Sequence, residues 1–257
     1  MKLKSLVCGT FLALVAFAAP ASAAAIVGNF NISGGAILTP IGTNYALDFV
    51  PPTNPDPAGN GVWDSTFPST GYFLSINPTP VSPHTQVTIK DVTNNPASAP
   101  PYTFVTTGAT VSVPNFLSGF TAAGLGGLSF ELTQVLASVA PVCTGAEAVD
   151  QSCTPAAGSP FTLTRRTDGV DTSYGVLGLF HNTNGDLGGG GGRFTTQNFG
   201  ATIAGILAQL ASGTPISASA SATFSSAAIP EPATLLTFGV GSGILALRRR
   251  RKARQTA

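Results

Sequence analysis

Very few side chains in this sequence could take part in acid–base or nucleophilic chemistry. The only histidines are His84 and His181, and a hydrolytic triad needs a nucleophile, a base and an orienting acid. Ser173 could serve with His181, but a chain this rich in serine offers such partners everywhere. The central region has only two glutamates, Glu131 and Glu147, and neither stands in a recognisable motif of paired glycosidase carboxylates. We therefore predict that the protein is not an enzyme and has no catalytic residues.

Oxygen-bearing side chains occur at two places that could bind calcium. The segment Asn182–Asp186 has oxygen ligands at alternate positions, as calcium loops do. An EF-hand is excluded, because its sixth position would be Leu187 instead of glycine and its twelfth Arg193 instead of glutamate. A looser site at the end of this segment, or at Asp168 with Asp171, stays open as an alternative. We predict no metal and no other cofactor.

Glycine-rich and hydroxyl-rich stretches allow two further interpretations. Gly188–Gly192 has the composition of a phosphate loop, but Arg193-Phe194 follows where that motif needs Lys-Ser or Lys-Thr. We therefore expect a flexible surface loop there. Thr106–Thr110 and Ser217–Ser226 could form flat, weakly polar faces of the kind used in ice binding, although no repeat builds a regular array. Ice binding is the least favoured function.

The clearest pattern lies at the C-terminus. The tripeptide Pro230-Glu231-Pro232 precedes the apolar run Ala233–Leu247, which has 15 residues and no charge. A helix of this length spans about 22 Å, less than the roughly 30 Å of a bilayer core, so it would insert with local thinning and snorkelling. The two prolines keep the tripeptide extended and accessible to a protease.

A basic tail follows the apolar run directly. It consists of Arg248, Arg249, Arg250, Arg251, Lys252 and Arg254. Under the positive-inside rule this topology signal stays cytoplasmic, which places everything before Pro230 on the far side of the membrane.

Tripeptide, apolar run and basic tail together resemble the PEP-CTERM protein-sorting segment, also known as the C-terminal domain of ice-binding proteins. The resemblance covers about 28 of the 257 residues. It implies an exosortase, a membrane-embedded cysteine transpeptidase, as partner, a transient membrane anchor, and a bacterium with an outer membrane that exports polysaccharide. The alternative is an ordinary tail anchor that remains in place.

The N-terminus agrees with export. Lys2 and Lys4 form a basic region, Leu6–Ala19 is apolar, and Ala21-Ser22-Ala23 has the pattern of a signal-peptidase site. Cys8 precedes the apolar core, so it should leave with the signal. We predict a signal peptide at 1–23, an exported domain at 24–229 and the sorting segment at 230–257.

The exported domain is acidic and contains one pair of cysteines. Residues 24–229 have four Lys or Arg against ten Asp or Glu, a formal net charge of −6. An acidic domain without a basic patch is not expected to bind nucleic acid. Cys143 and Cys153 would lie in an oxidising compartment, which predicts a disulfide between them.

Short apolar runs separated by turn residues predict an all-β domain, a β-sandwich or jelly-roll-like fold. We expect strands at Ile26–Ile32, Asn44–Val50, Gly71–Ile76, Thr85–Val92, Phe104–Val113, Leu128–Ala140, Phe161–Arg165, Ser173–His181, Arg193–Asn198 and Ile216–Phe224. Leu128–Ala140 could also be a helix, but its alternating side chains favour a strand. Ser33-Gly34-Gly35 should be a turn, and Pro114 should end a strand. One helix is predicted at Thr202–Ser212, because its apolar residues recur at helical spacing and Gly213 is a natural cap.

These features predict an exported surface or extracellular-matrix protein with a structural or interaction role, which associates with exopolysaccharide. The alternative is a secreted carbohydrate-binding module or weak glycan hydrolase. Aromatic side chains such as Trp63, Tyr72 and Tyr102 on one face would favour carbohydrate binding, and a pocket with two carboxylates would favour an enzyme.

Overall fold

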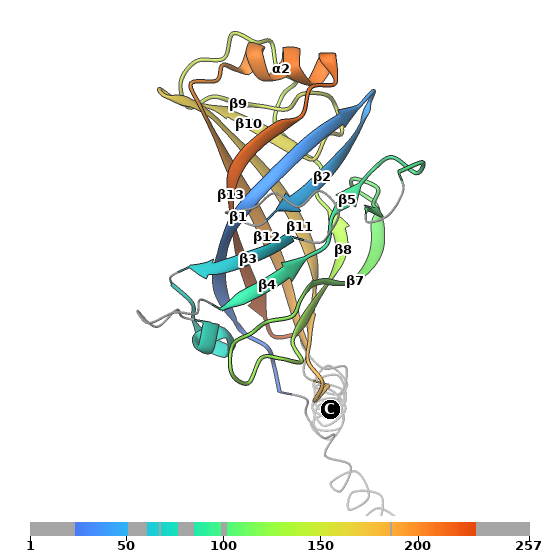
Figure 1. Cartoon of the computed structure of the whole chain (residues 1–257), viewed down its shortest axis with the longest axis vertical. Coiled ribbons are helices and arrows are strands. Elements are labelled where there is room, and N and C mark those ends of the chain that lie inside the picture. The colour runs from blue at the N-terminus through green and yellow to red at the C-terminus, as the bar shows by residue number, and fades with distance from the viewer. Residues whose placement is uncertain are drawn as a thin grey trace, which may run out of the picture. The chain divides into compact units, whose positions relative to one another are not determined.

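The computed structural model describes residues 24–50, 61–66, 68–76, 85–98, 102–185 and 187–229. Ala25–Ala228 form one compact unit (Figure 1). This unit is all-β, as predicted, with one α-helix, α2 (Ile203–Ser212), and one 3-10 helix, η1 (Gly71–Ile76). The strands are β1 (Gly28–Ile41), β2 (Asn44–Val50), β3 (Gly61–Thr66), β4 (Gln86–Ile89), β5 (Val92–Thr93), β6 (Thr103–Phe104), β7 (Thr110–Ser118), β8 (Ser129–Val135), β9 (Ser152–Cys153), β10 (Phe161–Arg165), β11 (Gly169–His181), β12 (Leu187–Phe199) and β13 (Ile216–Ala227).

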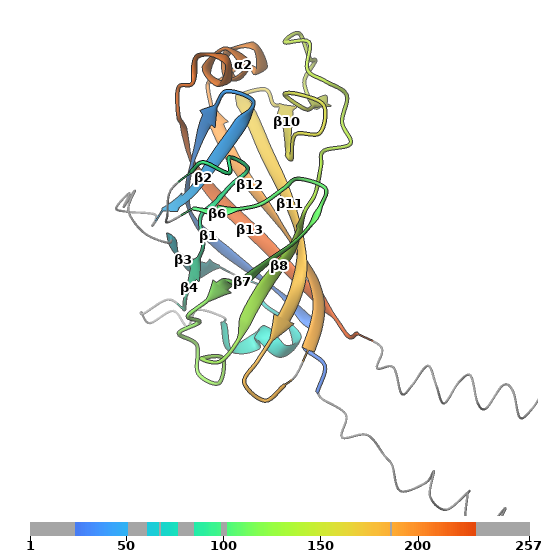
Figure 2. The same ribbon diagram turned by 90° about the vertical axis from the view of Figure 1, so that its right-hand side faces the viewer.

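The sheet closes on itself, so that its halves face one another across the interior as the layers of a sandwich do. The ring runs β1–β13–β12–β11–β8–β7–β4–β3 and returns to β1. Its long antiparallel ladders join β1 to β13 and β12 to both β11 and β13. The first and last strands of the unit are therefore neighbours, and this pairing completes the ring (Figure 2).

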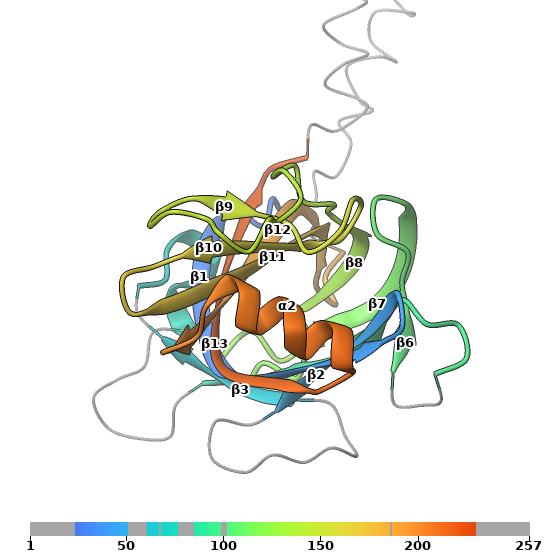
Figure 3. The same cartoon turned by 90° about the horizontal axis from the view of Figure 1, so that it is seen from above.

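The ring is complete only at one end, because β1 and β11 change partners along their length. β1 pairs with β3 through Asn31–Ser33 and with β2 through Gly35–Ile41. β11 pairs with β8 through Val176–His181 and with β10 before Gly175. Among the described residues no strand pairing joins β2, β5 or β6 to β9 or β10. We call this end the open end and the other the closed end; α2 lies across the open end (Figure 3).

Aromatic rings fill the interior of the closed end. Phe30 is fully buried and its ring lies 4.8 Å from that of Phe73 and 5.4 Å from that of Phe224, centroid to centroid. Phe130 and Phe180 continue the cluster at 4.7 Å from each other. Buried aromatic side chains of this size contribute most of the apolar area removed from water, so this cluster is the main core of the domain.

Glycines on the strands make room for these rings. Gly192 pairs with Phe224 across β12 and β13, and a Cβ atom on Gly192 would lie 2.3 Å from the Phe224 ring. A Cβ on Gly190 would lie 2.8 Å from the ring of Phe180. The run Gly188–Gly192 is thus part of strand β12, and the prediction of a flexible loop was wrong because each of these two glycines lies beneath a ring of another strand.

Three other local predictions were also wrong. β1 continues through Ser33-Gly34-Gly35, where Gly34 lies beneath the ring of Trp63. β7 continues past Pro114, because register shifts on both sides of Val113 take the proline out of the regular ladder. Gly71–Ile76 forms η1 instead of a strand, since Gly71 has φ +61° and the turn buries Phe73.

The predicted helix is confirmed together with its caps. The Thr202 hydroxyl accepts a hydrogen bond from the Gly205 amide at 3.0 Å, and Gly213 has the left-handed conformation at φ 74°. α2 buries Ile203 and Ile206 in a second, smaller cluster with Leu163 and Val170. The helix therefore covers the open end without joining the aromatic core. The strand predicted within Leu128–Ala140 is confirmed as β8. The strands predicted at Phe161–Arg165 and Ser173–His181 are confirmed as β10 and part of β11, which pair with each other.

Candidate functional site

The residues of the predicted sorting motif lie outside the described part of the structure. This applies to Pro230, Glu231 and Pro232, to the apolar run, and to the basic tail Arg248, Arg249, Arg250, Arg251, Lys252 and Arg254. The last strand, β13, ends at Ala227, directly before them. The ring of strands is thus complete before the tripeptide begins.

The predicted disulfide is formed between Cys143 and Cys153. Cys153 is buried in the small cluster beneath α2, so the disulfide fastens its loop to the open end. Glu147 lies in the same loop and accepts hydrogen bonds from the amides of Thr144 and Gly145, which lower the pKa of its carboxyl group. Although the two sulfurs and this carboxylate lie within 4.8 Å of one another, sulfurs joined in a disulfide are not metal ligands.

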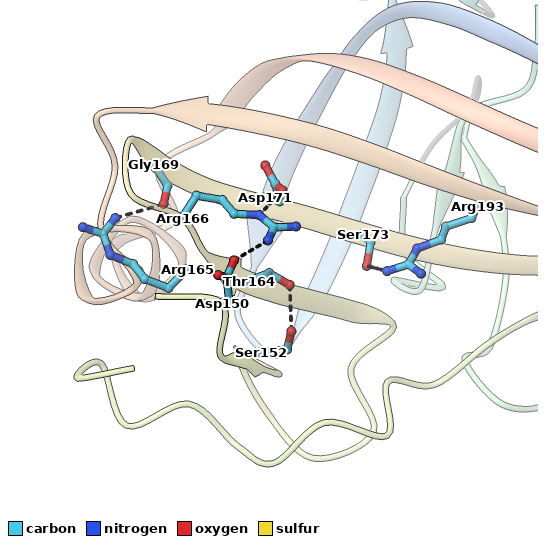
Figure 4. Close-up of polar contacts among 9 residues, drawn as sticks. All are labelled: Asp150, Ser152, Thr164, Arg165, Arg166, Gly169, Asp171, Ser173 and Arg193. Carbon is cyan, nitrogen blue, oxygen red and sulfur yellow. Dashed lines mark hydrogen bonds and ion pairs between the residues drawn. The ribbon is translucent and has the colours of Figure 1, made fainter. Parts of the chain in front are cut away.

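One of the aspartates considered for calcium, Asp171, is bound by an arginine (Figure 4). The guanidinium of Arg166 donates to Asp171 and to Asp150, both at 2.6 Å. These two hydrogen bonds raise the pKa of Arg166, with that to Asp171 the stronger cause. A cation at Asp168 and Asp171 would have to displace this guanidinium, so the arrangement disfavours calcium there. Asp186 lies outside the described residues.

The basic side chains of the described residues all bind their own chain. Arg165 donates to the carbonyl oxygens of Gly169 and Ala201, both at 2.9 Å, and thereby ties the β10–β11 turn to the start of α2. Arg193 donates to the Ser173 hydroxyl at 3.1 Å (Figure 4), and Lys90 to a carbonyl of β7. They form no continuous basic surface of the kind that phosphate backbones require.

The residues considered for catalysis are not brought together. Ser173 and His181 lie eight positions apart on the continuous strand β11, which separates them by about 26 Å. His181 instead faces Glu131, with Nε2 and Oε2 3.4 Å apart, and Ser173 accepts from Arg193. Glu131 lies on β8, whereas Glu147 belongs to the disulfide loop. His84 lies outside the described residues.

The aromatic residues considered for carbohydrate binding do not form a surface. Trp63 is fully buried between β1 and the core. The Tyr72 hydroxyl accepts a hydrogen bond from Asn182 at 2.7 Å beside the closed end. Tyr102 is half-buried, and burial, followed by the nearby carboxylates of Asp48 and Asp91, raises the pKa of its phenol group.

Asp48 and Asp91 form a buried acidic pair between β2 and β5. The register of these strands places them opposite each other, and the Phe49 amide donates to Asp91 at 2.8 Å. Asp91 is fully buried, and this burial raises the pKa of its carboxyl group to about 7. The hydrogen bond from Phe49 acts against the shift, and the charge of Asp48 adds to it. Sequence reasoning missed this pair, because the two residues share no local motif.

The outer face of β13 is polar and regular. Ser217, Ser219, Ser221, Thr223 and Ser225 are exposed, in alternation with the inward side chains of this strand. β13 itself pairs with β1 on one side and with β12 on the other. The Thr106–Thr110 segment lies elsewhere, at the open end, so the two stretches considered for ice binding do not form one face.

A cleft of about 690 Å³ opens between α2, the β1–β2 turn and the chain around β6. Its lining includes hydroxyl and amide side chains from the β1–β2 turn and the chain around β6, leucines of α2, and the half-exposed Phe104. A smaller cavity of about 50 Å³ lies deeper, and both are lined by Leu38, Phe161 and Leu210. Sequence reasoning did not find this cleft, since its walls come from five segments that only the folded chain brings together.

Two buried hydroxyl groups lie in the wall of the cleft. The oxygens of Tyr45 and Thr107 are buried, and neither has a well-formed hydrogen bond within the described part of the chain. Burial raises the pKa of the Tyr45 phenol to about 12, and the neighbouring Thr107 hydroxyl acts against this shift. The two hydroxyl groups are thus neighbours that interact with each other in the wall of the cleft.

Comparison with protein families identifies one feature of the chain. Residues 228–252 match the model described as the PEP-CTERM protein-sorting motif. The chain therefore contains this motif, which implies export, sorting at a membrane and recognition by an exosortase-type membrane enzyme. No curated protein and no solved structure matches the chain. Within the described residues no helix has the length and apolar character needed to cross a membrane.

Proposed function

We propose that this protein is made as a membrane-anchored precursor, processed at its sorting motif, and released to act at the cell surface or in the extracellular matrix. The observation that carries the proposal is the PEP-CTERM motif at residues 228–252. Its position in the sequence supports processing, because β13, the last strand, ends at Ala227, before the tripeptide begins. A cut at the tripeptide leaves every strand pairing of the domain in place.

The precursor is anchored by the apolar run after the tripeptide, with its arginines in the cytoplasm and the β domain on the opposite side. The charge distribution supports this orientation, since half of all Lys and Arg residues follow Leu247. The signal peptide at residues 1–23 starts the export. Oxidising conditions on the far side agree with the disulfide beneath α2.

The role of the released domain is structural or based on binding, without catalysis, and its partner is exopolysaccharide. The separation of Ser173 from His181, and of Glu131 from Glu147, supports a non-catalytic role. A second candidate, a carbohydrate-binding module, is favoured by one observation, the cleft at the open end.

Replacement of the central residue of the tripeptide tests the processing. We expect Glu231→Ala to leave the full C-terminus on the protein, whereas the wild type loses its terminal arginines. The measurement is the intact mass of both proteins from a bacterium that contains an exosortase. Ser225→Ala, just before the motif on an exposed position of β13, serves as control and should mature normally. A Glu231→Ala protein of wild-type mature mass would refute the proposal.

A further inference from the structure

We propose that the cleft at the open end binds an uncharged saccharide, a ligand with hydroxyl groups along its edges and apolar C–H faces. The juxtaposition that carries this inference is that side-chain hydroxyl and amide groups line the same cleft as leucine and phenylalanine side chains. The inference rests on the second candidate function and gives it a site. It does not depend on the sorting motif.

The dimensions of the cleft suit a small ligand. Its volume of about 690 Å³ lies within the roughly 300–1,000 Å³ typical of ligand sites. The cleft is open to solvent on one side. A chain of sugar units can therefore enter from the side, with one unit inside the cleft and its neighbours outside.

The polar wall offers donors and acceptors that the protein does not use itself. The Asn94 side-chain oxygen accepts from the Tyr45 amide at 2.6 Å, which orients the side chain and leaves its NH₂ group available. Thr43, Asn44 and Thr106 line the same wall, and no hydrogen bond from their side chains occurs within the described residues. Ligand hydroxyls can satisfy these groups as donors and as acceptors.

The apolar wall complements the other face of a sugar ring. Phe104 is 50% exposed although it is a large aromatic residue, and it lies in the cleft. Leu207 and Leu210 of α2 line the same cleft. The negative face of an aromatic ring attracts polarised C–H groups, which a pyranose ring presents on its apolar face.

Charge restricts the ligand to a neutral one. Among the described residues that line the cleft, none has an acidic, basic or histidine side chain, so a charged group would lose hydration without a counter-charge from them. The net charge of −6 over residues 24–229 further disfavours acidic polysaccharides. A purely apolar ligand would cover the free hydroxyls and amides of the polar wall without binding them, which costs free energy.

The test uses the full-length chain in a detergent without a sugar headgroup, and calorimetric titration with defined hexasaccharides. The neutral probes are β-1,4-glucan, β-1,3-glucan and mannan oligomers; an oligogalacturonate and 1-octanol are the charged and apolar comparators. We expect at least one neutral probe to bind, and Phe104→Ala to weaken this binding about tenfold. Ala211→Arg, on the exposed part of α2 that lines the cleft, should abolish binding by filling the entrance.

Matched controls separate the cleft from general effects of these changes. Phe199→Ala removes another exposed phenylalanine, and Ala208→Arg adds the same cation to α2; neither residue lines the cleft. Both variants should bind like the wild type. The proposal is overturned if no neutral probe binds, if the oligogalacturonate or 1-octanol binds more tightly, or if Ala211→Arg retains binding. None of these outcomes would alter the Glu231→Ala result, so the two proposals fail separately.

Discussion

The two ends of the same sheet fill their interiors in different ways. At the closed end, aromatic rings from β1, β8, β11 and β13 meet in one cluster, and glycines on neighbouring strands lie beneath them. At the open end the sheet splits, a short helix and a disulfide loop cover it, and a cavity and a cleft remain. The rings packed against glycines thus lie where the ring of strands is complete, and the cleft lies where it is not.

The largest effect is expected from removal of a ring at the closed end. Phe30→Ala takes away a fully buried side chain that contacts four other phenylalanines, and it should lower the free energy of unfolding by about 3–5 kcal/mol. Phe104→Ala at the open end removes a half-exposed ring and should change it by less than about 0.5 kcal/mol. Urea unfolding of both variants measures the difference. Equal losses would contradict the division into two ends.

A glycine that lies against an aromatic ring at the closed end provides a sharper test of the difference between the two ends. Gly192→Ala places a Cβ atom 2.3 Å from the Phe224 ring and should cost about 1–3 kcal/mol through overpacking. Gly126→Ala is the control, because nothing lies within 4 Å of its Cβ position and its φ angle is not positive. The control should be neutral or slightly stabilising in the same unfolding experiment.

A compensating change identifies the cause of this loss. Phe224→Leu shortens the side chain over Gly192, so the double variant should lose less stability than the sum of the two single variants. If the stability losses of the two single variants simply added up in the double variant, the Phe224 ring would not be the reason why position 192 requires glycine.

Features that depend on neighbouring residues could be predicted from the sequence, and features that depend on distant pairings could not. The helix α2 carries its own signals, with Thr202 before it and Gly213 after it. The disulfide followed from the export signals and the presence of only one cysteine pair. In contrast, Gly188–Gly192 has a local composition typical of a loop, and the rings that give it a place in a strand come from β11 and β13.

The same reason explains the missed site. The cleft requires the β1–β2 turn, the chain around β6, the loop before β10 and α2 to meet. The residue pattern within any one of these segments does not indicate that the segment will lie next to the others. The closure of the ring depends likewise on contacts such as that between Asn31 and Thr223, which are 192 residues apart. Composition could predict an all-β fold. The mixed polar and apolar lining of the cleft could be recognised only from the structure.

The last expected effect on stability concerns the acidic pair formed by Asp48 on β2 and Asp91 directly before β5. The pKa of Asp91 is raised from 3.8 to about 7 by burial, so the folded protein holds this proton more tightly than the unfolded chain between these pH values. The associated stability is therefore complete below about pH 4 and is lost as the pH rises through about 7. Allowing for solvent screening, the loss is on the order of 2 kcal/mol.

Asp91→Asn should remove this pH dependence while it keeps the acceptor for the Phe49 amide. We expect the variant to be more stable than the wild type at pH 8, and its advantage to shrink or reverse at pH 4, because an amide cannot titrate. Urea unfolding midpoints of the two proteins at both pH values measure the difference. Since Phe30 and its neighbours carry no titratable group, Phe30→Ala should lower stability by the same amount at pH 4 and pH 8. If the wild type and Asp91→Asn gave parallel profiles across this range, the buried pair would have no such role, and the pH response could not be assigned to the strands beside the open end.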